Sequence, residues 1–332
     1  MVLCYRSANR PATRPQPWNR TMVHVGLTLA VALAASSSAV NLAQRLGYDA
    51  DTRLLIVHAD DVGLSHGVNR ATAQAAAVGP VSSFSVMAPA PWLPEIAANC
   101  RRHPEWDVGV HLTLTSEWRG IRWGSVASAD DVPGLLDEHG YMHQDIVSVA
   151  LRATPEEVER ELRAQIDRVI SLGIEPTHLD THMGAVFARA EFFEVYYRLG
   201  VEYGIPVMMP NPTAGAIARA REEGYPIDDQ YLDIARNGPL PLIDELITEV
   251  PDGPLDARVR HYHDVIRALR PGVTQLIVHL ATGGEETRAI TNAWRNRYND
   301  FRIFSDPDTT RFLEEQNVKL IGWRDLHVLM PE

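Results

Sequence analysis

Cysteine and lysine are scarce in this chain, and each shortage excludes a class of protein. The 332 residues include two cysteines, Cys4 and Cys100, so a framework of several disulfides cannot form. Lys319 is the single lysine, and 43 acidic residues outnumber 31 basic ones, which gives a net charge of −12. Because binding to nucleic acid needs clustered Lys and Arg side chains, no nucleic-acid partner is expected.

A hydrophobic run long enough to cross a membrane is also missing near the N-terminus. The apolar stretch of residues 25–35 is shorter than the ~20 residues that a span needs, so no stable membrane anchor is expected. It follows a segment that has arginines but no acids, and small residues come after it, as in a signal peptide. The sequence thus predicts a disordered targeting segment over residues 1–45, cleavage between Ala35 and Gln44, and a secreted or periplasmic protein. The alternative is a cytoplasmic enzyme with an N-terminal extension, and Met22 is an alternative start.

Beyond residue 50, strand-like and helix-like segments alternate to the end of the chain. The strand-like segments are residues 53–58, 81–87, 107–114, 177–180, 205–209, 273–279 and 318–322. The clearest helix is predicted over residues 155–171, because Thr154 and Glu157 can form a capping box before it. Such alternation predicts an α/β protein in which helices surround a parallel sheet. About seven strands suit a single-domain, distorted (β/α) barrel over residues 50–332.

Two long stretches interrupt this alternation, residues 116–150 and residues 210–254. Loops of such length in a compact domain are usually lids or insertions. The first of them carries Trp118 and Trp123. These side chains could stack on a sugar ring or anchor the loop to the barrel, and the sequence leaves both alternatives open.

Asp60 and Asp61 stand directly after the buried apolar run of residues 54–59, which is typical of a central strand in a parallel sheet. In parallel α/β folds, the segments that follow the carboxyl ends of the strands carry the chemistry. Two adjacent carboxylates repel each other, so a cation or a shared proton is expected beside them. The alternative is structural: one acid caps the helix predicted near His66, and the other faces solvent.

Histidines stand in two later strand-like segments. His111 lies within one of them, and His178, Asp180 and His182 alternate along the next. Residues two apart on a strand share a face, so these last three side chains should point to one side. Alone, His111 would be interpreted as a core residue. Together with the Asp pair, these residues suit a divalent metal bound by one carboxylate and two imidazoles, with positions left open for water and substrate.

An ordered set of motifs carries these residues, in segments 55–65, 109–115, 177–182, 276–279 and 317–326. As a set, the segments resemble the motifs of the YdjC-like carbohydrate deacetylases, the family of the chitooligosaccharide deacetylases, over about residues 53–327. Three departures from the family pattern concern the wall around the site. His58 stands where the family usually has Asn, residues 183–187 stand where further histidines often follow, and Leu280 stands in place of a proline.

The resemblance implies a polysaccharide-deacetylase-like barrel that holds one divalent metal cation, Mg²⁺ or Zn²⁺. The implied roles are metal ligands Asp61, His111 and His182, general base Asp60, and general acid His279. His178 and Asp180 are expected behind the ligands, where Asp180 can orient an imidazole as carboxylates commonly do at metal sites.

The expected function is that of a metal-dependent hydrolase that removes N-acetyl groups from amino-sugar carbohydrates. Its partner is then an N-acetylated amino sugar or oligosaccharide, and a homodimer is compatible with the sequence. Two alternatives stay open. One is another metal-dependent hydrolase on the same scaffold, and the other is a sugar-binding protein that has lost catalysis. The sequence does not specify the sugar, its chain length or its linkage.

Overall fold

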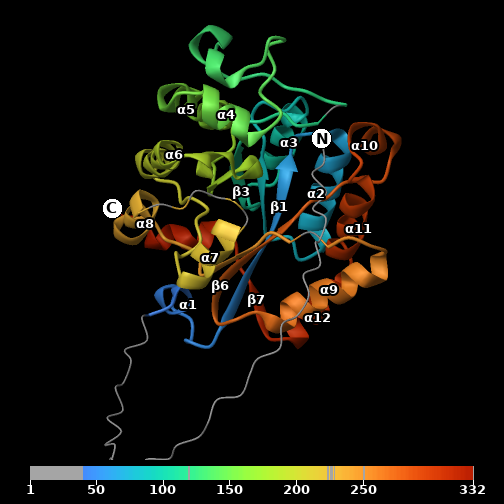
Figure 1. Ribbon diagram of the computed structural model, residues 1–332. Helices are drawn as coiled ribbons and strands as arrows, with labels where there is room; N and C mark the ends of the chain where they lie inside the picture. Colours follow the sequence, from blue (N-terminus) through green and yellow to red (C-terminus); the bar gives the residue numbers. More distant parts are fainter. Residues whose placement is uncertain are drawn as a thin grey trace, which may run out of the picture. The chain divides into compact units, whose positions relative to one another are not determined.

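The computed structural model describes residues 40–118, 120–222, 224, 227, 229–249 and 251–331 (Figure 1). These residues belong to one compact unit that begins at Val40. The expected targeting segment lies outside the described residues up to residue 39. Its last residues are folded, because the short helix α1 (Leu42–Arg45) buries Leu42 and Ala43 beside Leu54 and Trp323. The folded unit therefore starts earlier than the predicted residue 50.

Seven parallel strands form a single sheet with the order β4-β3-β2-β1-β6-β5, and β7 pairs with β1. Their bounds are β1 (Arg53–Val62), β2 (Ser83–Val86), β3 (Val108–Leu112), β4 (Leu179–Thr181), β5 (Glu245–Ile247), β6 (Gly272–Val278) and β7 (Val318–Leu320). The long strand β1 lies at the centre (Figure 1). Along one side it pairs with β6, and along the other it pairs first with β7 and then with β2.

Single bridges, rather than a ladder, join the two edges of this curled sheet. Leu179 in β4 exchanges backbone hydrogen bonds with Pro206 and Met208. A few residues on, Met209 and Asn211 exchange hydrogen bonds with Ile243, just before β5. The expected α/β fold with a curled parallel sheet is confirmed. The prediction of a strand over residues 205–209 is wrong, because this segment only bridges the edges, and β5 is a strand that the sequence analysis missed.

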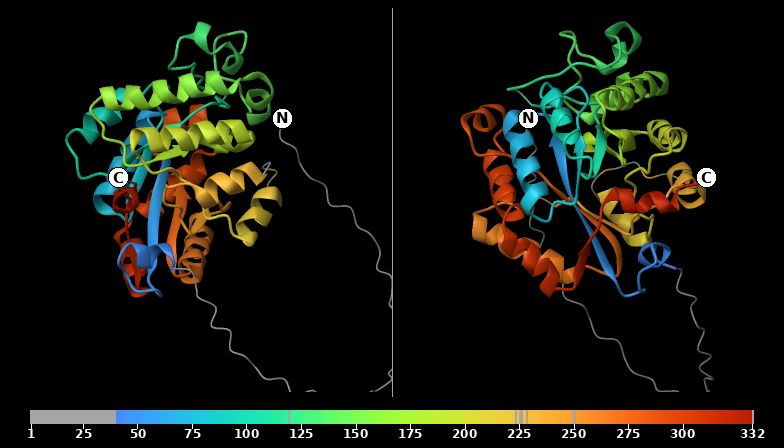
Figure 2. Two further views of the ribbon diagram at one scale, coloured as in Figure 1. Left: turned by 90° about the vertical axis from the view of Figure 1, so that its left-hand side faces the viewer. Right: turned by 180° about the vertical axis from the view of Figure 1, so that it is seen from behind.

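Helices lie around the outside of the sheet (Figure 2). Their bounds beyond α1 are α2 (His66–Val78), α3 (Leu93–Cys100), α4 (Ile146–Arg152), α5 (Pro155–Ser171), α6 (Ala190–Tyr203), α7 (Ala214–Glu222), α8 (Asp229–Asn237), α9 (Leu255–Ala268), α10 (Glu285–Ile290), α11 (Trp294–Phe304) and α12 (Pro307–Glu315). The predicted helix over 155–171 is confirmed as α5, with the capping box of Thr154 and Glu157 in place. The helix buries Val158, Leu162, Ile166 and Val169, whereas Ile170 is exposed. Within the described part of the chain, every helix is too short or too polar to span a bilayer.

The two long interruptions contain regular structure of their own. Residues 116–150 include the 3₁₀ turns Ala129–Asp131 and Pro133–Leu135 and the start of α4, and residues 210–254 include α7, α8 and β5. Trp123 is buried and donates a hydrogen bond from its indole to the Thr115 carbonyl, so it anchors the first loop. In the second stretch, Pro210 and Ile243 form one of the single bridges that join the sheet edges, and α7 and α8 lie between these two residues in the chain.

Candidate active site and metal centre

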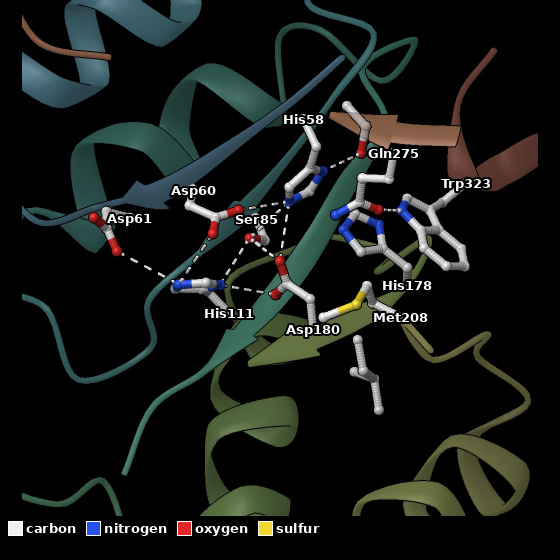
Figure 3. Close-up of polar contacts among 12 residues, drawn as sticks. His58, Asp60, Asp61, Ser85, His111, His178, Asp180, Met208, Gln275 and Trp323 are labelled. Carbon is white, nitrogen blue, oxygen red and sulfur yellow. Dashed lines mark hydrogen bonds and ion pairs between the residues drawn. The ribbon is translucent and has the colours of Figure 1, made fainter. Parts of the chain in front are cut away.

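A β-bulge near the end of β1 carries both adjacent acids. Between Ala59 and Val62 the chain advances three residues while its partner β2 advances two, so one extra residue is inserted at the Asp60–Asp61 step. Asp61 has a left-handed φ of 64°, which aspartate tolerates better than most residues. The two carboxylates consequently point in different directions (Figure 3). Ser65 caps the following helix α2, so neither acid has the capping role that was the alternative.

Asp61, His111 and His182 bring three potential ligand atoms together at the carboxyl ends of β1, β3 and β4. Asp61 Oδ1 lies 3.1 Å from His182 Nδ1 and 3.4 Å from His111 Nε2, and these two nitrogens are 3.3 Å apart. A point about 2.0–2.2 Å from all three atoms exists beside such a triangle, and this is the usual length of Zn–N and Zn–O bonds. The three side chains are buried. The residues predicted as ligands thus fit a divalent cation.

The electrostatics of this triangle also suit a cation. Asp61 Oδ1 is buried and receives no hydrogen bond from the described residues, so a cation would supply the partner that it lacks. Burial alone would raise the pKa of Asp61, but Arg297 and the two imidazoles hold it well below its usual value. Burial lowers the pKa of His182, whereas Glu117 and Asp61 raise it to about 9. Without a cation this imidazole therefore holds a proton that metal binding must displace.

Asp180 connects the ligand His111 to a second buried histidine, His58 (Figure 3). Asp180 Oδ1 accepts from His111 Nδ1 at 2.9 Å, and Asp180 Oδ2 lies 3.0 Å from His58 Nε2. Ser85 donates to Asp180 Oδ2 at 2.8 Å. This arrangement fixes His111 with Nε2 turned toward Asp61, which is the orientation that a metal ligand needs. Burial lowers the pKa of His58, but Asp180 and Asp60 raise it to about 9, so His58 carries positive charge between two carboxylates.

His178 lies away from the ligand triangle. Its ring stacks on Trp323 with centroids 5.3 Å apart, and it meets His58 edge-on at 4.9 Å (Figure 3). Burial and the nearby His58 lower its pKa, so it is neutral. A Cβ on Gly109 would come within 2.3 Å of the His178 ring, which explains the glycine two residues before His111. His178 therefore packs against His58 and Trp323 and lies away from the candidate metal ligands.

Asp60 and His279 face each other beside the triangle. Asp60 Oδ2 lies 3.9 Å from His279 Nε2 and 4.0 Å from His111 Nε2, while Asp60 Oδ1 lies 3.2 Å from His58 Nε2. Burial and the charge of Arg297 lower the pKa of His279, so its imidazole is neutral at rest. Its side chain is 26% exposed, which leaves it open to a ligand. A carboxylate and an imidazole next to a cation site are the groups that a hydrolase needs as base and acid.

The site also contains Glu117 and Arg297, which the sequence analysis did not predict. Glu117 lies 3.0 Å from His182 Nε2, on the side of the ring opposite Asp61. Arg297 in α11 lies 2.5 Å from Asp61 Oδ2, and its guanidinium stacks 4.7 Å above the Trp118 ring. Glu117 stands next to a tryptophan that was noted for other reasons, and Arg297 belongs to no motif. No local signal marked either one.

The candidate ligands, base and acid open into one cavity of about 560 Å³. Asp60, Asp61, His111, His182 and His279 line it, as do Glu117, Trp118 and Arg297. This volume lies within the range of pockets that bind small molecules. His58, His178 and Asp180 are fully buried behind the wall. The predicted site residues thus separate into five that can reach a ligand and two, His178 and Asp180, that lie behind them.

A family model matches nearly the whole folded unit. Residues 54–315 match the model described as YdjC-like protein. The chain belongs to the YdjC-like family. A relative in Thermus thermophilus named carbohydrate deacetylase is 33% identical over 286 residues, which cover 83% of this chain and 95% of the relative. A carbohydrate deacetylase of Geobacillus stearothermophilus is 28% identical over 83% of this chain and 99% of its own.

A solved structure of a candidate cellobiose-phosphate cleavage protein from Enterococcus faecalis V583 shares the fold. Its TM-score is 0.69 at 22% identity, and the match covers 83% of this chain and 99% of that one. At this identity the likeness concerns the fold alone. The resemblance inferred from the motifs is confirmed by the family match, and the fold of the YdjC-like unit is supported by an independent structure.

Proposed function

We propose that this YdjC-like chain is a metal-dependent carbohydrate deacetylase that hydrolyses the N-acetyl group of an amino sugar. The observation that carries the proposal is the convergence of Asp61 Oδ1, His111 Nε2 and His182 Nδ1 beside a separate carboxylate in one cavity. Relatives named carbohydrate deacetylase support the reaction class. A glycosidase would use two carboxylates and would have no need for the two imidazoles.

Asp61, His111 and His182 would hold the cation. When bound, it polarises the acetyl carbonyl and lowers the pKa of water. Two imidazole nitrogens and one carboxylate oxygen suit zinc by ligand softness, and the family resemblance also allows magnesium. Asp180 contacts the second ring nitrogen of His111 and Glu117 that of His182, which fixes the nitrogen that each imidazole presents to the cation site. Arg297 holds Asp61 Oδ2, so Oδ1 is the oxygen left for the cation.

Asp60 acts as the general base and His279 as the general acid. The Asp60 carboxylate takes a proton from the attacking water as the oxygen bonds to the acetyl carbon. His279 is neutral at rest, so it needs a proton before it can serve as the acid. Asp60, 3.9 Å away, is the neighbouring group that holds a proton after the attack. When the C–N bond breaks, His279 donates that proton to the sugar nitrogen, which leaves as a neutral amine.

The test is acetate release from N-acetylglucosamine and its β-1,4 oligomers, with the metal content of the purified protein measured in parallel. Protein that contains about one divalent ion per chain and releases acetate together with free amine supports the proposal. Bound metal without acetate release from any of these sugars would favour another metal-dependent hydrolase. Sugar binding without metal and without turnover would favour the non-catalytic alternative.

We further propose that the protein is exported and that the targeting segment is removed. The support is the order of arginines, apolar residues and small residues before the folded unit. Because Leu42 and Ala43 are buried in the folded unit, cleavage is expected before Val40. N-terminal sequencing of the native protein tests this, and an intact segment 22–34 would contradict export.

A further inference from the structure

The cavity changes character along its length. At the catalytic end, charged groups and imidazoles line it. Beyond them the lining includes the polar side chains of Arg219, Asp244, Glu245 and Thr248. Most of the wall there is nevertheless apolar, with Met183, Met208, Ile217, Leu246 and Ile277 among its residues. These come from five places in the chain: the 3₁₀ turn after His182, the bridging segment, α7, β5 and β6.

The apolar wall runs from the catalytic groups along β5 and β6. On β6, Ile277 precedes His279 by two residues, and Leu246 on β5 is paired in register with Gln275. Glu245, which also lines the cavity, is level with Thr274. Thr274 precedes His279 by five residues, which corresponds to about 16 Å along an extended strand at 3.3 Å per residue. The cavity is thus a channel along the strands that begins at the catalytic groups.

Such a wall does not suit a row of sugar rings. Each pyranose carries hydroxyl groups, and burying these without hydrogen-bond partners is unfavourable. Methionine, isoleucine and leucine side chains offer no donors for them, and the guanidinium of Arg219 lies 3.8 Å from the Glu245 carboxylate, with which it forms an ion pair. The phenol of Tyr231, which also lines the cavity, already donates to the Phe187 carbonyl. The chemistry of this wall matches a chain of methylene groups instead.

Met183 shows that the apolar lining starts at the metal site itself. It follows the ligand His182 directly, lies in the cavity, and is 50% exposed. Its backbone is left-handed, with φ of 56°, a conformation that is unfavourable for methionine. The fold therefore holds a large apolar side chain in an unfavourable conformation beside the catalytic groups. The same cavity contains the catalytic groups and this apolar wall, so the wall is within reach of a substrate bound at the catalytic end.

We propose, on the basis of the deacetylase function proposed above, that the substrate is an N-acylated amino sugar that bears an aliphatic chain. The sugar nitrogen lies at the catalytic end, and the chain lies along Met208, Ile217 and Leu246. The chain is either the substituent on the anomeric oxygen or the N-acyl group itself. The two sources share the same aliphatic chemistry, and substrates can separate them.

The first experiment compares binding of methyl and octyl glycosides of N-acetylglucosamine, below the micelle concentration of the octyl compound. Calorimetry on the metal-loaded Asp60→Asn variant measures binding without turnover. The octyl glycoside should bind about tenfold or more tightly than the methyl glycoside, because several methylene groups leave water. Equal affinity for both, together with equal affinity for methyl glycosides of N-acetyl- and N-octanoylglucosamine, would overturn the proposal.

The second experiment measures kcat/KM of the wild-type holoenzyme with these substrates and with diacetylchitobiose. A preference for the octyl glycoside places the chain on the anomeric oxygen, and a preference for the N-octanoyl sugar places it on the nitrogen. Turnover of diacetylchitobiose without any gain from octyl groups would overturn this inference and leave the deacetylase function intact. Tight binding of an octyl compound without turnover of any sugar would overturn the function and leave the channel intact.

Two neighbouring variants in α7 supply a matched pair. Ile217 lines the channel, whereas Ala218 is exposed and is not part of its wall. Ile217→Asn should lower the octyl-to-methyl affinity ratio several-fold, because a polar amide replaces apolar wall. Ala218→Asn should keep the wild-type ratio. Equal ratios in both variants would contradict the placement of the chain along α7.

Discussion

The two walls of the cavity are built in opposite ways. The polar wall comes from the ends of β1, β3 and β4, which are paired strands, and its side chains are held by hydrogen bonds such as Asp180 to His111. The apolar wall comes largely from residues 206–247, which contain the single-bridge closure and the short strand β5. Polar chemistry needs directed groups and hence a rigid frame, whereas apolar contact needs only surface and volume. The barrel thus separates the directed polar groups from the apolar surface that we propose selects the substrate.

The largest effect is expected on the polar wall from Asp61→Ala. Removing the carboxylate takes away one of three ligands and leaves the Arg297 charge beside the two imidazoles. We expect loss of stoichiometric metal and of activity, as measured by elemental analysis and acetate release. Glu245→Gln, which removes a carboxylate that lines the same cavity on the apolar side, is the control and should keep the metal. Full metal content in Asp61→Ala would show that the ligand set is wrong.

Asp60→Asn should separate a base from a ligand within one dipeptide. The amide keeps the shape of Asp60 but cannot take a proton, so kcat should fall by ~10²–10⁴, the usual contribution of a positioned base. Metal content should stay near that of the wild type, because Asp61 supplies the ligand oxygen. Turnover at the wild-type rate with metal bound would leave Asp60 a structural role only.

His279→Ala should cost less than the loss of the base, and its cost should depend on the leaving group. We expect a fall of ~10²-fold for amide hydrolysis, because the sugar amine needs a proton to leave. An activated aryl acetate should lose much less, since its leaving group departs as an anion. The measurement is the ratio of the two rates with metal content held constant. The same loss on both substrates would contradict the role as acid.

Glu117→Gln tests whether metal affinity depends on the carboxylate that contacts the second ring nitrogen of His182. The variant removes the charge that faces His182 Nε2, so metal affinity should fall by about 10–100-fold while the fold is kept. Glu95→Gln is a matched control, because Glu95 holds His66 in the same manner at 2.6 Å, away from the triangle. Titration with a competing chelator measures both affinities. An equal change in the two variants would mean that Glu117 has no special link to the metal.

The smallest effect is expected in a comparison of the amide hydrogen-exchange rates of the two walls. Amides of β1, which is paired on both sides, should exchange hydrogen slowly. The amides of Met208 and Asn211, held by single bridges, should exchange at least tenfold faster. Hydrogen exchange of the metal-free protein measures this difference without a contribution from the ligand. Equal protection in both segments would remove the contrast between a rigid and an adaptable wall.

The sequence was most informative where a single segment contains the whole signal. Thr154 and Glu157 predicted the start of α5, because a capping box acts within one turn. The Asp pair after an apolar run likewise predicted a site at a strand end, because the run and the pair lie within one short segment. Reasoning from local patterns did not predict how the barrel closes. Residues 205–209 have the pattern of a strand, yet their partner residues allow only single bridges.

Residues far apart in the chain explain what was missed in the site. Glu117 meets His182 across 65 positions, and Arg297 meets Asp61 across 236. Neither belongs to a periodic pattern, and each owes its place to a loop or helix that folds back over the strand ends. The same holds for the aliphatic channel, whose five named residues come from five separate segments.

By itself, then, the sequence determined the α/β class, the family and the three residues that converge as candidate ligands, because strand alternation and short motifs act over neighbouring residues. The tertiary structure decided the rest. It placed an extra residue in β1, so that Asp60 and Asp61 face different partners. It also set Arg297 on Asp61, joined the two edges of the sheet by single bridges, and brought apolar side chains from separate segments into one cavity. These features depend on which distant segments meet, and that is fixed only when the whole chain packs around one core.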